Sequence, residues 1–241
     1  MQSAGIHYET HLGPIYSWML GDLDAAFGRS AAEIADLNLP AAGTAIDLGA
    51  GLGLHALPLA RHGFQVTAID GCEVLLDELR SRTGTLPIVA IHQDLLQFPS
   101  CIKEPAAVIL CMGDTLTHLP TLTAVGELLQ SVADSLLPEG MFAATFRDYA
   151  TKKLEGDARF IPVRADENRI LTCFLEYGDE QVTVHDVLNS KQEGRWRQTV
   201  SSYPKLRLAP EWVAARLTGM GFNVRRDTTP GGMVRIVATR A

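Results

Sequence analysis

The sequence predicts an α/β fold: a seven-stranded, mostly parallel sheet with helices on both faces, plus an inserted antiparallel β segment. Short apolar runs alternate with helical periodicity from residue 44 onward. The runs are continuous, which is typical of parallel strands buried on both faces. A glycine-rich turn joins the first run to the helical stretch after it. Repeated strand–helix units of this kind imply right-handed crossovers.

The elements of the first part of the chain follow in a regular order. The first forty residues are mostly helical, and Pro40 precedes the first expected strand. Five expected strands share a short length and an apolar composition: residues 45–48, 65–69, 88–92, 107–112 and 141–146. The clearest helix between them places five apolar side chains on one face, namely Val125, Leu128, Leu129, Val132 and Leu136.

The strand–helix rhythm breaks after Tyr149. Residues 159–208 contain no convincing helix and are expected to form an antiparallel ribbon. Its three β-leaning runs are residues 170–177, 182–188 and 196–203. We expect this ribbon to form the roof or a wall of a substrate pocket, or a contact between subunits.

The last part of the chain returns to regular α/β elements. Pro210 suits the first turn of a helix, and residues 222–228 and 234–239 read as a closing strand pair. The chain is therefore predicted to be a single domain with four parts: residues 1–41 as an N-terminal helical lid, 42–149 as the ligand-binding core, 150–208 as the β insertion, and 209–241 as the closing helix and strand pair.

Composition limits the possible partners. The chain has 241 residues and a formal net charge of −7, which disfavours binding to phosphate backbones of nucleic acid. The apolar run at residues 106–112 is too short to span a bilayer, and the first twenty residues lack Lys and Arg. We therefore expect a cytoplasmic protein with no membrane partner. The four cysteines form no CxxC pair, so we expect free thiols and no metal site.

The most informative segment is the glycine-rich turn after the first strand. Glycines stand at alternate positions: Gly49, Gly51 and Gly53. Glycine lets a ligand approach the backbone closely, and the N–H groups at a helix start favour a carboxylate or a phosphate. A tight turn without a ligand remains the alternative. Pro58 predicts a kink near His55 in the helix that follows.

Two acidic residues end the second and third strands. Asp70 lies nineteen residues after Gly51, where a carboxylate can accept hydrogen bonds from ribose hydroxyls. The alternative is an N-cap for a helix over residues 71–82. Asp94 could accept from an adenine amino group next to the backbone N–H of Leu95, or simply cap a loop.

The order of these motifs resembles that of the class I S-adenosylmethionine-dependent methyltransferases. The run Cys111-Met112-Gly113-Asp114-Thr115-Leu116 follows the fourth strand, and Pro138-Glu139-Gly140 precedes the fifth, as in that family. The resemblance covers residues 42–146 and 210–239. It implies a Rossmann-like fold, an enzyme, S-adenosyl-L-methionine as cofactor and S-adenosyl-L-homocysteine as product. The chain is most similar to small-molecule methyltransferases with a β insertion after the fifth strand, such as glycine and sugar-amine N-methylating enzymes.

The resemblance also implies roles for individual residues. In that group an N-terminal helix covers the cofactor, and residues 7–9 and 15–19 resemble it. The implied cofactor-binding residues are Tyr16, Trp18, Asp47, Gly49, Ala50, Gly51, Asp70, Gly71, Asp94, Leu95, Met112 and Gly113. For the aromatic residues among them, a plain core stripe of the first helix is the alternative.

The acceptor side is expected at the end of the fourth and fifth strands. Asp114 and His118 are the candidate catalytic residues, because either could orient or accept a proton. A surface or helix-start position is the alternative for His118. Tyr8, Arg147 and Tyr149 are the candidate substrate-binding residues, with solvent exposure or a salt bridge as the alternative for the last two.

Other functions compete with methyl transfer to a small molecule. A nucleotide-linked dehydrogenase shares the glycine turn and Asp70, but its fingerprint would need Gly or Ala where Leu54 stands. A methyltransferase fold can also persist as a cofactor-binding or scaffold protein without catalysis. The sequence leaves open the acceptor, the choice between N and O, and whether the chain forms a homodimer.

Overall fold

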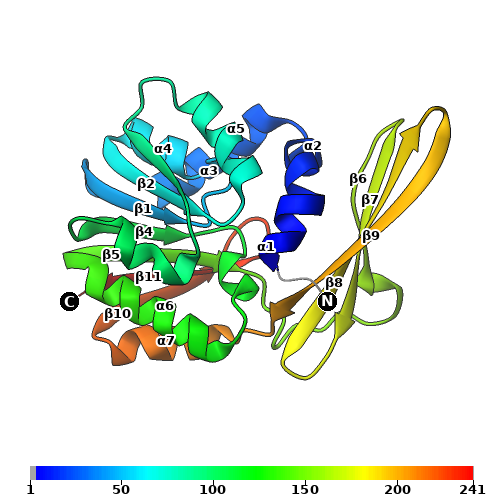
Figure 1. Cartoon of the computed structure of the whole chain (residues 1–241). Coiled ribbons are helices and arrows are strands. Elements are labelled where there is room, and N and C mark those ends of the chain that lie inside the picture. The colour runs from blue at the N-terminus through cyan, green and yellow to red at the C-terminus, as the bar shows by residue number, and fades with distance from the viewer. Residues whose placement is uncertain (1–3, 241) are drawn as a thin grey trace.

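The main sheet carries the fold that the sequence predicts. The computed structural model describes residues 4–240 (Figure 1). Its seven-stranded sheet has the order β10-β11-β5-β4-β1-β2-β3. The strands are β1 (Gly43–Leu48), β2 (Phe64–Asp70), β3 (Ile88–His92), β4 (Ala106–Cys111), β5 (Leu136–Phe146), β10 (Phe222–Thr228) and β11 (Val234–Arg240). Strands β1 to β5 run parallel, whereas β11 is antiparallel to both β5 and β10. The predicted fold class is confirmed.

The order of the strands sets the place of the site. β1 lies between β2 and β4, so the chain first winds to one side of β1 and then to the other. In parallel α/β sheets, such a switch point opens a crevice at the carboxyl ends of the strands. The turns after β1, β2, β3 and β4 all meet at this edge.

Helices cover both faces of this sheet (Figure 1). They are α3 (Leu23–Asp36), α4 (Ala56–His62), α5 (Glu73–Thr83), α6 (Leu122–Ser135) and α7 (Pro210–Gly219). One apolar cluster packs α3, α4 and α5 against the sheet, and a second packs α6 and α7 against the opposite face. Thr121 caps α6 by accepting a hydrogen bond from the N–H of Ala124, as expected for a hydroxyl at the N-cap.

The predicted kink at Pro58 is wrong. Helix α4 begins at Ala56, so Pro58 lies in its first turn. N–H groups of the first turn have no acceptor within the helix, so the N–H that proline lacks costs no helical hydrogen bond. The glycine-rich turn simply extends to His55 before the helix starts. Pro58 is thus compatible with a regular helix.

The insertion forms a separate antiparallel sheet of four strands rather than the expected three. They are β6 (Phe160–Ala165), β7 (Arg169–Tyr177), β8 (Gln181–Gln192) and β9 (Arg195–Leu206). The sequence missed β6 because Pro162 interrupts it, and proline is tolerated there only because β6 is an edge strand. The expected turn at Glu193-Gly194 joins β8 to β9, with both residues at positive φ, 50° and 76°.

The N-terminal helices lie between the two sheets (Figure 1). They are α1 (Ala4–His7), the π-helical turn η1 (Tyr8–Leu12), the 3-10 turn η2 (Gly13–Ile15) and α2 (Tyr16–Leu20). Three more 3-10 turns are η3 (Leu95–Cys101), η4 (Thr115–His118) and η5 (Gly156–Arg159). Residues 1–3 of the predicted lid, and residue 241, lie outside the described range, and the division of the chain into four parts stays a prediction.

Two further sequence expectations concern chemistry and membranes. All four cysteines are free, and Cys72 and Cys111 are buried. Among residues 4–240, no helix is both long and apolar enough to cross a bilayer.

Helix α6 allows a direct test of the core. Leu128 is fully buried, whereas Leu122 on the same helix is 44% exposed. We expect Leu128→Ala to lower the free energy of unfolding by about 2–5 kcal/mol, because it leaves a cavity. Leu122→Ala is the matched control, with an expected change below about 1 kcal/mol. Urea denaturation measures both, and similar losses in the two variants would contradict this packing.

Candidate active site

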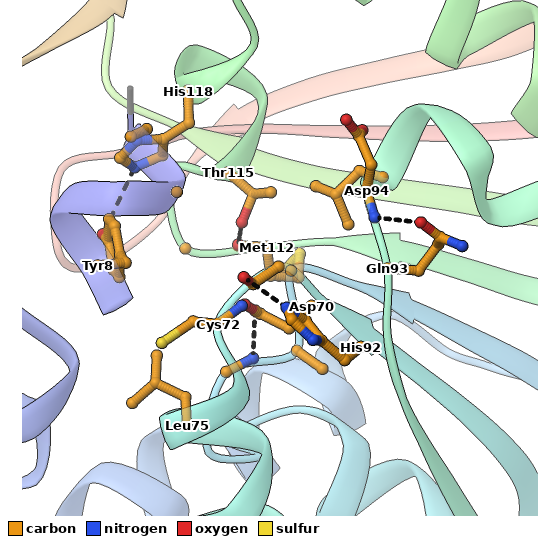
Figure 2. A pocket seen from close by; sticks show the side chains of 18 of the residues that line it. Tyr8, Asp70, Cys72, Leu75, His92, Gln93, Asp94, Met112, Thr115 and His118 are labelled. Atoms are coloured by element: carbon orange, nitrogen blue, oxygen red, sulfur yellow. Dashed lines mark hydrogen bonds between the residues drawn. The ribbon is translucent and has the colours of Figure 1, made fainter. Parts of the chain in front are cut away.

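A cavity of about 530 Å³ opens at the carboxyl edge of the main sheet (Figure 2). Its walls come from the turns after β1, β2, β3 and β4 and from the N-terminal helices. Twelve of the predicted residues line it: Tyr8, Tyr16, Gly49, Ala50, Gly51, Asp70, Gly71, Asp94, Leu95, Met112, Gly113 and His118. Five others, Trp18, Asp47, Asp114, Arg147 and Tyr149, do not.

The glycine turn forms the floor of the cavity. The N–H of Gly49 donates to the carbonyl of Ile69 at 2.8 Å, which ties the turn to β2. A Cβ at Gly49 would lie 2.5 Å from the Thr115 side chain, and the φ of Gly49 is +76°, so only glycine fits. A Cβ at Gly71 or Gly113 would meet nothing within 4 Å. The backbone at those two positions therefore borders open space that a ligand can fill.

Asp70 links two turns of the cavity floor. Its Oδ2 accepts from the N–H of Gly51 and its Oδ1 from the N–H of Cys72, both at 2.8 Å. Burial raises the pKa of this carboxyl, although the two N–H donors oppose the shift. Asp70 is not the N-cap of α5, because Cys72 occupies that position. The carboxylate keeps further lone pairs for a ligand hydroxyl.

Asp94 shows the capping contact that the sequence left open. Its Oδ1 accepts from the N–H of Leu96 at 2.9 Å and caps η3. The same residue borders the cavity next to Leu95 and Met112. Capping and ligand binding are compatible, since a carboxylate offers two oxygens.

The opposite end of the cavity is aromatic. The Tyr8 hydroxyl lies 3.5 Å from Nε2 of His118 (Figure 2), and the two rings meet edge to face. Burial raises the pKa of Tyr16 to about 12 and that of Tyr8 well above its usual value, so both hydroxyls stay protonated. Burial, aided by the nearby Lys205 ammonium, lowers the pKa of His118 to about 3. The imidazole of His118 is therefore neutral at physiological pH.

Trp18 does not face the cavity. Its indole N–H donates to Oδ2 of Asp166 at 2.6 Å, in the turn between β6 and β7. The guanidinium groups of Arg164 and Arg169 lie 5.9 and 5.4 Å from its ring. The predicted cofactor contact of Trp18 is thus replaced by a contact between α2 and the insertion sheet.

Asp114 has a different environment from the one expected of a proton acceptor. It is 1% exposed, and its Oδ2 contacts Nζ of Lys205 at 2.5 Å and Nη1 of Arg147 at 3.1 Å. Burial would raise the pKa of Asp114, but the two cations outweigh burial and lower it. Arg147 forms this ion pair with Asp114. Tyr149 packs with Leu175 in the apolar cluster of the insertion. The salt bridge that the sequence left open as an alternative for Arg147 is therefore present, with Asp114 as the partner.

Asp47 lies beneath the glycine turn, near the end of β1. It is 1% exposed, and its Oδ2 has no hydrogen-bond partner among the described residues. Burial raises the pKa of Asp47 to about 6, although His55 and the N–H of Ala56 oppose the shift. Asp47 does not line the cavity, because the glycine turn at residues 49–51 forms the wall there.

Sequence reasoning missed half of the cavity wall. The additional lining residues are Ala4, Gly5, Leu52, Leu54, His55, Cys72, Leu75, His92, Gln93, Leu96, Thr115, Leu119 and Pro120. His92 is the last residue of β3 and Gln93 directly follows it, so their position at a strand end could have indicated them. The ligand roles of the residues that the sequence did predict stay predictions.

Comparison with known proteins adds independent findings. A family model for a methyltransferase domain matches residues 45–140, which include the glycine turn, Asp70 and Asp94. The chain is 28% identical over 199 residues to YqeM, a protein of Bacillus subtilis (strain 168) named as a methyltransferase, covering 80% of this chain and 78% of that protein.

Two solved structures share the fold. DesVI from Streptomyces venezuelae has a TM-score of 0.80 at 18% identity, over 97% of this chain and 100% of that chain. CalS10 with bound S-adenosylmethionine, an amino pentose methyltransferase from Micromonospora echinaspora, has a TM-score of 0.75 at 17% identity, over 96% and 97%. Residues 45–140 thus match a methyltransferase domain, and nearly the whole chain shares the fold of these two structures.

The buried Asp47 makes the stability of the protein dependent on pH. Its folded pKa of about 6 exceeds the ordinary value of 3.8, so folding costs free energy once the pH rises through about 6. We expect Asp47→Asn to raise the free energy of unfolding at pH 8 by about 1–3 kcal/mol. The difference should vanish near pH 4, where the carboxyl is protonated in both states.

Urea titrations of the ligand-free protein at several pH values measure this effect. Asp77→Asn is the control, because the Asp77 side chain is 69% exposed. A stability difference for Asp47→Asn that does not change with pH would contradict the assignment.

Proposed function

We propose that this protein is an S-adenosylmethionine-dependent methyltransferase that methylates an amine nitrogen of a small molecule. The observation that carries the proposal is the neutral His118 at the aromatic end of the cavity. A base whose conjugate acid has a pKa of about 3 is poorly suited to deprotonate a hydroxyl. A neutral amine already presents its lone pair and needs only to be oriented. Nitrogen is therefore the acceptor that this site suits best.

The cavity floor fits the cofactor. The glycine turn lines the cavity at Gly49, Ala50 and Gly51, where its backbone would hold the methionine part. Asp70 would hold the ribose hydroxyls, and Asp94 with the N–H of Leu95 would hold the adenine. When bound, S-adenosylmethionine supplies a methyl group on a positively charged sulfur. Asp47 would act beneath the glycine turn without touching the ligand.

The remaining residues would shape the methyl-transfer end. Met112 and Gly113 border this end, and Gly113 leaves room for the acceptor because no atom lies within 4 Å of its Cβ position. The faces of Tyr8 and Tyr16 suit a cationic sulfur. In the tautomer that carries its proton on Nδ1, Nε2 of His118 would accept from an amine N–H or from the Tyr8 hydroxyl. These residues would act by orienting the reactants and excluding water.

The relatives agree with an amine acceptor. CalS10 is an amino pentose methyltransferase and shares the fold over nearly the whole chain. We therefore propose an amino sugar or a compound of similar size as the acceptor. A panel of amino sugars, amino acids and alkylamines, each with its hydroxyl counterpart, tests this by formation of S-adenosylhomocysteine. Methylation of the hydroxyl compounds alone would contradict the proposal.

Asp70 provides a test of the cofactor site. We expect Asp70→Ala to weaken S-adenosylhomocysteine binding at least tenfold, because each charge-assisted hydrogen bond contributes about 1.5–3 kcal/mol. Isothermal titration calorimetry measures the affinity, and Asp77→Ala on α5 is the exposed control. Unchanged affinity in Asp70→Ala would remove the ribose contact from the proposal.

His118 provides a test of the acceptor site. We expect His118→Ala to bind S-adenosylhomocysteine normally and to turn over an amine about 10-fold to 100-fold more slowly. Because His118 stays neutral, the loss should be the same from about pH 6 to about pH 9. A loss confined to one side of this range would show that His118 titrates there and acts as a base.

A further inference from the structure

One face of strand β9 contacts three parts of the site at once. Alternate residues of a strand point to the same side, and here Ser201, Tyr203 and Lys205 point away from solvent. Ser201 bonds to Nδ1 of His7 at 2.7 Å. The Tyr203 ring stacks on His7 at 4.0 Å and on His118 at 5.5 Å. Lys205 pairs with Asp114.

The Lys205 ammonium occupies an unusual place for a lysine. The residue is 5% exposed, and its Nζ lies 5.9 Å from the centre of the Tyr149 ring and 5.8 Å from that of Tyr203. Its contact at hydrogen-bond distance is the carboxylate of Asp114. An apolar side chain would fill this space without the cost of burying a charge. The charge therefore has to be explained by what it does to Asp114.

Asp114 holds the turn that brings His118 to the cavity. Its backbone is left-handed, with φ +79°, directly after Gly113 at +74°. Oδ1 accepts from the N–H of Arg147 at 2.9 Å and from the Thr117 hydroxyl at 3.1 Å. Only an ionised carboxylate can accept from these groups and from Lys205 together. Asp114 is the residue before η4, and η4 ends at His118.

We propose that Lys205 is a positioning residue for methyl transfer: through Asp114 it holds the turn that presents His118 to the cavity. The insertion sheet thereby takes part in the reaction from outside the cavity wall. The inference rests on the proposed role of His118. Lys205 touches neither ligand, so its effect is on geometry and on the electrostatic environment of the imidazole.

The electrostatic effect of Lys205 on His118 can be measured as a change in the pKa of the imidazole. A lysine with a purely structural role would leave that pKa unchanged. Several charged or titratable groups surround His118, and they come from five elements: His7 of α1, Tyr8 of η1, Asp114 before η4, Arg147 after β5, and Tyr203 with Lys205 of β9. Lys205 is the cation that most strongly disfavours a protonated imidazole. Its removal should raise the pKa of His118.

The experiment uses the full chain with histidine labelled by nitrogen-15, with His118→Asn to assign the ring signals. In Lys205→Met, we expect the His118 pKa to rise by about one unit and its ring nitrogen shifts to change. S-adenosylhomocysteine affinity should stay within about twofold, while amine turnover falls about tenfold or more. Lys205→Arg keeps the cation and should restore the His118 signals. Lys191→Met, an exposed lysine of β8, is the control.

The outcomes separate the possibilities. A folded Lys205→Met with unchanged His118 pKa and nitrogen shifts would overturn the proposal and leave Lys205 as a structural anchor. Where Lys205→Met does not fold, Lys205→Gln answers the same question. A wild-type His118 that titrates between about pH 5 and about pH 9 would also overturn it. Failure of the wild type to methylate any amine would count against the proposed function, while the His118 measurement would still decide the role of Lys205.

Discussion

The carboxylate of Asp114 is the interaction on which the acceptor side of the cavity depends. It accepts hydrogen bonds from the backbone and guanidinium of Arg147, from Thr117 and from Lys205. One side chain thus joins the end of β5, the turn η4 and strand β9. Because Asp114 is 1% exposed, water cannot replace a lost partner. A buried charge left without its partner costs several kcal/mol, so removing either side of the ion pair between Asp114 and Lys205 would be strongly unfavourable.

Asp70 performs a similar function on the cofactor side. It accepts the N–H of Gly51 from one turn and that of Cys72 from the next, so two turns of the sheet edge keep a common geometry. The two carboxylates lie at opposite sides of the cavity and are charged for different reasons. Asp114 is paired with two cations, whereas both oxygens of Asp70 accept backbone N–H groups and keep further lone pairs for a ligand.

The chemistry follows from what burial does to the titratable groups between these two anchors. Tyr8 and Tyr16 stay protonated and His118 stays neutral, so the aromatic end of the cavity orients polar groups without exchanging protons near pH 7. Transfer to a neutral amine requires no more than this. In the proposed reaction, catalysis would depend on closeness, alignment and exclusion of water, and the N-terminal helices lie between the two sheets where they would contribute to all three (Figure 1).

The sequence by itself determined the main sheet, the glycine turn and the place of Asp70 at the end of the second strand, because these depend on local periodicity and on turns at strand ends. Only the tertiary structure decided the partners of Trp18 and Asp114. Trp18 bonds to Asp166, 148 residues away, and Asp114 pairs with Lys205, 91 residues away. No local pattern encodes such pairings, because they exist only once the insertion sheet has folded back onto the core.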